Sequence, residues 1–491
     1  MSGPKNNQWK TLDRDLGRLN QLELATQYCS RPLVGPFIAL VFLLVAGTGS
    51  MFFFDEKPSL IIVAAAIFGG YMALNIGAND VANNMGPAFG ANALTMGGAI
   101  LIAAVAESAG ALLAGGEVVG TISKGIIEPS SLSDPEVFVW AMMAALISSA
   151  LWVNLATFVG APVSTTHSVV GGVMGAGISA AGFASVNWST MSKIAASWVI
   201  SPVLGGVIAA LFLSFIKKYI IYQDDKIDAA RRLVPVLIGI MAAAFATYLA
   251  LKGLKRIIKI DFTTSLFIGT ATGLIFYAIS RPAIRKQSEG LENRNKSLKV
   301  LFTIPLIFSA ALLSFAHGAN DVANAVGPLA AIVHAIEFEG SAAKVAIPIW
   351  VMVIGAFGIS FGLFLFGPKL IRMVGNQITK LNSMRAFCVA LSAAITVIVA
   401  SWAGLPVSST HIAVGAVFGV GFYREIEAER RVRQKRALVK VSQLVAPEER
   451  KRRKLVRRSH FITIISAWVV TVPATAVLSG VIFLILDILF L

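Results

Sequence analysis

Long runs of apolar residues without a charged side chain dominate the chain. Clear examples are residues 59–78, 300–316 and 461–486. A helix needs about 20 mostly apolar residues to cross the hydrocarbon core of a bilayer. One or two such runs fit buried core helices, but a dozen do not. The pattern therefore predicts an all-α polytopic membrane protein with about 11–13 membrane segments.

Composition and charge agree with this pattern. The 491 residues are 56% hydrophobic and only 14% charged, whereas soluble domains carry about 25% charged residues. The net charge is +16, and the basic residues lie between the apolar runs, as the positive-inside rule expects of cytoplasmic loops. We therefore expect a multi-pass protein of the cell (inner) membrane that contacts the lipid bilayer and no nucleic acid. The two cysteines, Cys29 and Cys388, form no disulfide framework or zinc pattern.

Two motifs each occur twice. Gly-Ala-Asn-Asp-Val-Ala-Asn at 77–83 recurs identically at 318–324. Pro-Val-Ser-Thr-Thr-His at 162–167 returns as Pro-Val-Ser-Ser-Thr-His at 406–411, in the same order along the chain. Internal duplication of this kind indicates two homologous halves.

The charges of corresponding loops indicate that the halves are inverted. Residues 281–299 hold six Lys and Arg, while the equivalent loop 55–58 holds one. Residues 424–458 hold fourteen, while their counterpart 183–194 holds one. The loops of one half are therefore expected outside and those of the other half in the cytoplasm. Inverted repeats are a transporter architecture, with the substrate site at the repeat interface near the membrane midplane.

This scheme divides the chain into five parts. We expect a cytoplasmic tail at 1–33, an extra first span at 34–54, half one at 59–216, connecting spans and loops at 217–299, and half two at 300–491. The basic insert 424–458 interrupts half two. Its charged pairs at i,i+4 spacing, beginning at Glu427 and Glu429, favour a solvated helix.

The first motif places an aspartate in an apolar segment of each half, Asp80 and Asp321. An aspartate at the centre of a membrane helix costs about 3 kcal/mol on insertion scales, so it needs compensation. A helix N-cap is one reading. A functional helix break is the other, because Gly, Asn and Pro cluster on both sides. Carboxylate and amide oxygens, here with Asn79 and Asn320, suit Na⁺, and a proton on either aspartate is the alternative.

The second motif suits an anion. Proline pre-sets the first turn of a helix, so Ser164, Thr165 and Thr166 are expected near a helix N-terminus. Free backbone N–H groups and hydroxyls there bind phosphate without an arginine. The alternative to an anion site is that these residues serve only as ordinary Ser/Thr helix caps. His167 and His411 follow directly and are interpreted as hydrogen-bonded structural residues, without the spacing of a zinc site.

Glu107 is a further buried acid, in the apolar run 97–115. The matching region of half two, 345–367, contains no acid. The sequence leaves two roles open for Glu107, a ligand of the coupling ion or a satisfied structural acid.

The doubled motifs resemble those of the inorganic phosphate transporter family known as PiT, over residues 59–216 and 300–491. The resemblance implies phosphate symport with Na⁺ or H⁺, two inverted halves and re-entrant hairpins near the second motif. It places phosphate contacts on Asp80, Asn83, Ser164, Thr165, Thr166, Asp321, Asn324, Ser408, Ser409 and Thr410. With the residue chemistry above, the coupling cation is expected at Asn79, Asp80, Asn320, Asp321 and Glu107.

The halves differ at two motif positions, so they need not contribute equally. Ser409 stands where half one has Thr165, and Ala325 where it has Asn84. A sulfate symporter of the same family and an anion channel are the alternatives to phosphate symport. No nucleophile elbow, nucleotide loop or metal-ligand spacing favours an enzyme or a further cofactor. A homo-oligomer is compatible with the sequence, which does not decide it.

Overall fold

The computed structural model describes residues 33–53, 60–127, 132, 134–159, 163–253, 260–337, 347–375, 381–438 and 458–491. Within these residues the secondary structure is helical, apart from one isolated bridge between Ile127 and Val186. Eleven helices are long and apolar enough to cross a membrane. The predicted all-α polytopic architecture is thereby confirmed.

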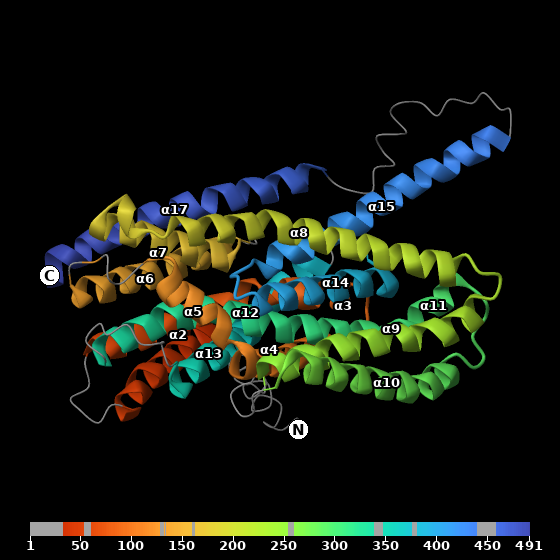
Figure 1. The fold of residues 1–491 in the computed structure, drawn as a ribbon, viewed down its shortest axis with the longest axis horizontal. Coiled ribbons are helices and arrows are strands. Elements are labelled where there is room, and N and C mark those ends of the chain that lie inside the picture. The colour runs from red at the N-terminus through yellow and green to blue at the C-terminus, as the bar shows by residue number, and fades with distance from the viewer. Residues whose placement is uncertain are drawn as a thin grey trace, which may run out of the picture.

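The helices follow the order of the repeats (Figure 1). A helix at Leu33–Phe53 comes first. Half one then contains α2 (Leu60–Asn79), α3 (Val81–Gly90), α4 (Met96–Ala114), α5 (Gly116–Gly120), α6 (Pro135–Val159), α7 (Thr165–Ala181) and α8 (Trp188–Ile216). The connecting helices are α9 (Lys226–Tyr248), α10 (Phe262–Gln287) and α11 (Asn295–Leu301). Half two contains α12 (Thr303–Glu337), α13 (Ile349–Met373), α14 (Ser383–Trp402), α15 (Ser409–Leu438) and α17 (Arg458–Phe490).

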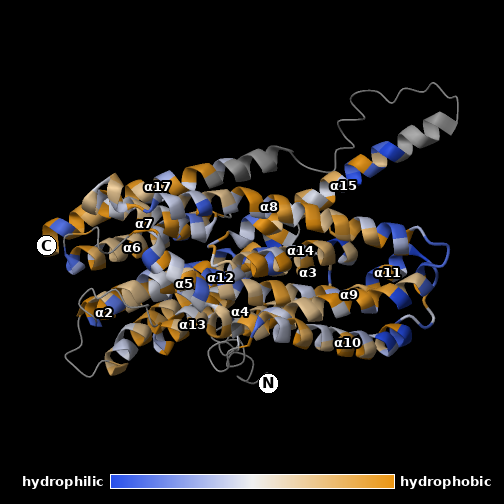
Figure 2. Ribbon diagram, in the orientation of Figure 1, coloured by the Kyte–Doolittle hydropathy of each residue, from blue (hydrophilic) through white to orange (hydrophobic). Residues whose placement is uncertain are grey.

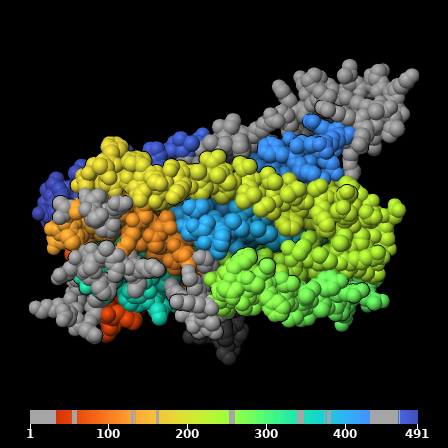
Figure 3. Space-filling model, viewed as in Figure 1, coloured from red at the N-terminus to blue at the C-terminus, as the bar shows by residue number. Residues whose placement is uncertain are grey.

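Polar residues gather at one end of the bundle. The end that carries α11 is strongly hydrophilic, while orange apolar residues prevail along the helices (Figure 2). The far part of α15 projects from this end, whereas the chain terminus Leu491 and the turn between α7 and α8 lie at the opposite end. The face seen in Figure 3 is formed largely by α8, α9 and α10. Helix α8 also carries exposed apolar side chains such as Val203 and Leu211, as expected for contact with lipid.

Helices of the two halves are exchanged. Helix α2 packs chiefly on α13 and α12 on α4, while α7 packs on α17 and α15 on α8. Equivalent glycines allow these contacts. A Cβ on Gly77 would lie 1.9 Å from the carbonyl oxygen of Ile359, and one on its repeat partner Gly318 would lie 2.2 Å from that of Glu107. Each half therefore supplies one helix to each tightly packed pair.

Where α4 meets α13, a residue of half one touches its own equivalent in half two. The hydroxyls of Ser108 and Ser360 are 2.7 Å apart, and these residues stand 252 positions apart in the sequence. The same spacing relates Gly110 to Gly362, whose Cβ positions would collide with backbone carbonyls of α12 and α2 respectively. Equivalent residues thus meet reciprocally, as they do about a two-fold axis.

Two helical hairpins approach each other at the centre of the bundle. Helices α6 and α7 pack together toward the end that carries Leu491, and α14 and α15 pack together on the other side of the centre. Helix α7, 17 residues long, is not among the eleven candidate spans. The tips of the hairpins touch, because the Thr166 hydroxyl donates to the carbonyl of Val407 over 3.0 Å. This arrangement matches the re-entrant hairpins that the family resemblance implied.

The predicted helix break at the aspartates is wrong for Asp321 and slight at Asp80. Helix α12 runs through Asp321 as 35 continuous residues. Between α2 and α3 only Asp80 leaves the helix, with right-handed helical angles of φ −84 and ψ −34. The motif glycine serves close packing against a neighbouring helix rather than a break. Few backbone carbonyls are therefore freed for a cation.

The basic insert begins as a helix. Helix α15 continues to Leu438, which fits the helix predicted there, and residues 439–457 lie outside the described part of the chain. The side chain of Glu427 does not stand alone on a solvated face, because it accepts hydrogen bonds from Lys217 and Tyr222 in the turn that follows α8. The predicted cytoplasmic tail 1–33 lies outside the described residues except for Leu33.

Single-cysteine labelling tests the inverted orientation of the halves. Ser189 at the start of α8 and Ala428 on α15 are both exposed and lie toward opposite ends of the bundle. In a background with Cys29→Ser and Cys388→Ala, a membrane-impermeant thiol reagent should label Ser189→Cys from outside intact cells. It should label Ala428→Cys only after permeabilisation. Labelling of both from one side would contradict the inverted arrangement.

Candidate functional site

The two hairpin tips and the two Asn-Asp motifs meet in a single buried cluster. Asp80 accepts hydrogen bonds from one threonine of each hairpin: from Thr165 over 2.6 Å and from Thr410 over 3.1 Å. The amide of Asn83 donates to the same Thr410 hydroxyl over 2.9 Å. Residues more than 300 positions apart in the sequence are thus joined at one carboxylate.

The second aspartate is bound by a different set of groups. Asp321 accepts from the Ser409 hydroxyl over 3.0 Å, and its Oδ2 lies 2.8 Å from Nε2 of His317. The amide of Asn324 crosses to the first hairpin, where it donates to Thr165 over 3.3 Å and to Thr166 over 3.1 Å. Each asparagine therefore contacts the hairpin of the other half.

Eight of the predicted site residues belong to this cluster, and each is at most 3% exposed. They are Asp80, Asn83, Thr165, Thr166, Asp321, Asn324, Ser409 and Thr410. Burial of so many polar groups is costly unless each is hydrogen-bonded. The reciprocal bonds between the halves offset much of that cost and hold the hairpin tips in place. Oδ1 of Asp321 is buried without a hydrogen-bond partner among the described residues.

Ser164 and Ser408 have a different part. Their hydroxyls accept from the backbone N–H of His167 over 3.1 Å and of His411 over 3.3 Å. They are N-caps of α7 and α15, as the cap reading of the second motif expects. The side chain of Asp80, by contrast, forms no cap hydrogen bond with α3, so the cap reading fails for the first motif.

Asn79 and Asn320 lie beside the cluster and bind the hairpins farther along. The amide of Asn79 donates to Thr157 on α6 over 2.9 Å. Its repeat partner Asn320 donates to Ser401 on α14 over 2.9 Å. In this structure the two amides fasten the first motif to the hairpin of their own half, and their place among the ligands of a cation stays a prediction.

Glu107 is linked to the site through His317, a histidine that lies outside the doubled motifs. The ring of His317 lies between two carboxylates, with Nδ1 at 2.5 Å from Glu107 and Nε2 at 2.8 Å from Asp321. The amide of Asn84 donates to the other oxygen of Glu107 over 3.0 Å. Asn84, Glu107, His317 and Asp321 thus form one buried polar chain, all at 1% exposure or less.

This chain exists in one half of the site only. Its first three members have apolar counterparts in the repeat: Ala325, Ile359 and Ile76. A signal for it was present, because His317 is four residues before Asp321 and so on the same face of α12. The neighbouring motif begins one residue later, and the mismatch with Ile76 concealed the histidine from a search for repeated residues.

The cluster offers ligands for a cation. One ligand atom each of Asp80, His317 and Asp321 lies within 4.8 Å of the others. Carboxylate and hydroxyl oxygens are hard ligands that suit alkali and alkaline-earth ions. Among the described residues, the groups bonded to the three carboxylates are hydroxyls, an amide and the His317 ring. One imidazole against three carboxylates leaves negative charge that a cation would offset.

Fold and site together define a class of protein, the polytopic membrane transporter with a buried polar centre where its two halves meet. Comparison with known proteins specifies the family. The model of the phosphate transporter family matches residues 76–479. The chain therefore belongs to the phosphate transporter family, as the doubled motifs indicated.

Individual relatives agree with this assignment. Two proteins carry the name "Putative phosphate permease". One, from Helicobacter pylori strain J99, is 45% identical, over 96% of this chain and 98% of the relative. The other, from Pyrococcus horikoshii, is 36% identical, over 87% of this chain and 97% of its own. A solved structure of a protein described as "The sodium-dependent phosphate transporter" superposes with a TM-score of 0.79 at 35% identity, covering 88% of this chain and all of the other.

The buried polar chain around His317 predicts that a double variant is more stable than one of its single variants. His317→Ile leaves Glu107 and Asp321 buried without their shared partner, and removal of one member of a buried ion pair costs about 3–5 kcal/mol. The double variant Glu107→Ile/His317→Ile reproduces the apolar counterpart of the repeat and should lose less. Thermal unfolding of both variants in detergent measures this. A double variant less stable than the single one would contradict the pairing.

Proposed function

We propose that this protein imports inorganic phosphate across the cell membrane by symport with a cation, and that the cation is Na⁺. The observation that carries the proposal is the buried cluster in which hydroxyls of two hairpin tips surround Asp80 and Asp321. Family membership supports phosphate as the substrate. Similarity to a transporter described as sodium-dependent supports Na⁺ as the coupling cation.

The hairpin tips supply what an oxyanion needs. Helices α7 and α15 both begin at the cluster, and helix N-termini present backbone N–H groups and positive dipole ends to an anion. Thr166 and Thr410 add hydroxyls beside them. Phosphate can also donate a hydrogen bond to a carboxylate when it is protonated, whereas sulfate accepts only. The aspartates therefore favour phosphate over sulfate.

The aspartates supply the coupling. A phosphate and a carboxylate about 4 Å apart repel by about 4 kcal/mol per pair of unit charges at an effective dielectric constant of about 20. A cation bound between Asp80 and Asp321 reverses that sign. Phosphate and Na⁺ therefore bind well only together, and linkage makes each tighten the other by the same factor.

The two aspartates need not share this role equally. Asp321 already has the His317 ring at 2.8 Å as a charge partner, while the hydrogen-bond donors to Asp80 are the neutral hydroxyls of Thr165 and Thr410. The His317 ring thus contacts Asp321 directly and lies farther from Asp80, within 4.8 Å. We expect the cation to interact most strongly with Asp80.

The duplicated halves provide the transport step. Exchanged helix pairs and hairpins that meet at the centre fit inverted repeats whose substrate site lies near the midplane. Movement of one set of elements against the other would then expose the site to each side in turn. A channel, in contrast, needs no carboxylates for coupling, so the buried acids favour a symporter.

Substitution of the aspartates tests the coupling. Asp80→Asn and Asp321→Asn keep the size of the side chain and remove its charge. Both should abolish Na⁺-driven accumulation of radiolabelled phosphate in proteoliposomes, and both should flatten the dependence of phosphate affinity on Na⁺. Asp80→Asn should have the larger effect on affinity. Variants that keep the full Na⁺ dependence would show that the acids are structural, and Glu107 would become the next candidate.

Loss of tip hydroxyls tests the anion site. Thr166→Ala and Thr410→Ala each remove a hydroxyl from the cluster, and a charge-assisted hydrogen bond is worth about 1.5–3 kcal/mol. Phosphate affinity should fall about tenfold or more in each. Ser168→Ala is the matched control, because that buried hydroxyl donates to the backbone carbonyl of Ser164 in its own helix. Wild-type phosphate affinity in both threonine variants would leave the hydroxyls a purely structural role.

A further inference from the structure

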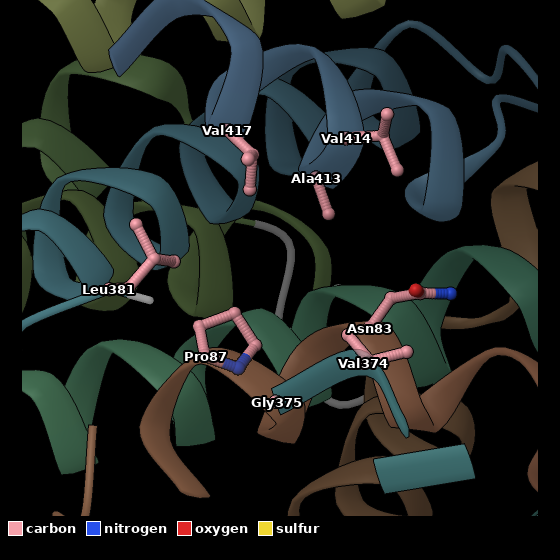
Figure 4. Close-up of a pocket in the computed structure, with 8 residues that line it drawn as sticks. All are labelled: Asn83, Pro87, Val374, Gly375, Leu381, Ala413, Val414 and Val417. Carbon is pink, nitrogen blue, oxygen red and sulfur yellow. The ribbon is translucent and has the colours of Figure 1, made fainter. Parts of the chain in front are cut away.

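A small cavity opens beside Asn83 (Figure 4). Leu381 in its wall precedes α14, whose first turns pack against the end of α11 through Phe387 and Phe302, so the cavity lies on the α11 side of the cluster. Its volume is about 20 Å³, which is room for about one water molecule. Ala413 and Val417 of α15 face Pro87 of α3 across it, and Val374 closes one side. Apart from Asn83, whose amide binds Thr410 in the site, the walls are apolar.

The repeat places a corresponding set of residues on the other side of the cluster. The correspondence is visible in the packing: a Cβ on Gly86 would lie 2.6 Å from Val374, and one on its repeat partner Gly327 would lie 2.7 Å from Ile122. The second motif likewise relates Ala413 to Val169. The first motif of each half is therefore covered by an equivalent segment, at Val374 in one case and at Ile122 in the other. We call the set Val374, Gly375 and Ala413 one seam and the set Ile122, Ser123 and Val169 the other.

The two seams differ in the size of their side chains. Val374, Gly375 and Ala413 line the cavity. Their counterparts Ile122, Ser123 and Val169 are each larger, and all three are 0% exposed. The difference lies in the sequence itself, so it persists in any conformation in which the equivalent segments pack against the hairpins.

We propose that the cavity beside Asn83 is the beginning of the passage by which the bound anion leaves toward the α11 end, and that its small side chains make it the looser of two gates. The opposite seam at Ile122 and Val169 is the tighter gate. This inference rests on the proposed transport function. Phosphate leaves Asn83 and Thr410 along α15 when Ala413 and Val374 separate.

The packing of a gate affects the rate of transport, whereas coupling to the cation affects the final accumulation of phosphate. Side chains at a gate alter the rate at which the passage opens, whereas the cation gradient sets the final ratio of phosphate inside to outside. Tightening the looser gate should therefore slow uptake without changing the final accumulation. Loss of a coupling carboxylate changes the final accumulation instead, so the two kinds of defect are distinguishable.

The test exchanges the side chains of the two gates. Val374→Ile/Ala413→Val gives the looser gate the residues of the tighter one. Its initial rate of Na⁺-driven phosphate uptake should fall about tenfold, which corresponds to ~1.4 kcal/mol at the barrier. Phosphate affinity in detergent and the final accumulation should match wild type. The matched control Ile122→Val/Val169→Ala loosens the opposite gate and should not slow uptake.

Wild-type uptake by the tightened variant, with normal binding, would overturn the gate assignment and leave the transport function intact. A second readout needs no phosphate. In the background with Cys29→Ser and Cys388→Ala, a small thiol reagent should modify Ala413→Cys faster than Val169→Cys. Equal or reversed reactivity would also overturn the proposal. Absence of phosphate binding by the wild-type protein would instead remove the proposed function, and this inference with it.

Discussion

The structure depends on the burial of three carboxylates at the centre of a membrane bundle. Asp80, Glu107 and Asp321 are each at most 1% exposed, and an ionised group in so apolar a setting persists only with partners. The surrounding structure supplies them: hydroxyls from two hairpin tips, the amide of Asn84, and the ring of His317 between two of the acids. Few of these partners come from the same helix as the acid they bind. The site therefore also joins the halves of the fold.

Duplication produces such a site from few residue types, because the same two motifs supply hydroxyl and amide groups from each half of the chain. The halves are then made unequal by a few substitutions. His317 and Glu107 on one side replace Ile76 and Ile359 on the other, which gives Asp321 an imidazole ring at 2.8 Å, while Asp80 is hydrogen-bonded by threonine hydroxyls. The halves also differ outside the polar site, where Ala413 in one half corresponds to the larger Val169 in the other. This second difference changes the packing beside the site. Chemical asymmetry at the carboxylates and steric asymmetry in the packing beside them are thus separate properties of the chain.

Much of this was predictable because repeated residues are visible without a structure. Helix number followed from hydropathy, and Asp80, Thr165 and Thr410 stood out because each occurs in a doubled motif. The cross-connections were not predictable, since the exchange of helices between halves depends on which surfaces pack in space. His317 escaped because it has no repeat partner. The helix break expected at Asp321 failed because Gly318 serves close approach to α4, and local sequence does not distinguish a packing glycine from a breaking one.

We propose that the buried carboxylates make the binding of the cation and the binding of the anion depend on each other. Reciprocal titration tests it most directly: phosphate affinity of the purified protein measured across Na⁺ concentrations, and Na⁺ affinity measured with and without phosphate. We predict that saturating Na⁺ tightens phosphate and that saturating phosphate tightens Na⁺ by the same factor. Phosphate affinity that does not change between Na⁺-free and Na⁺-saturated conditions would contradict the account.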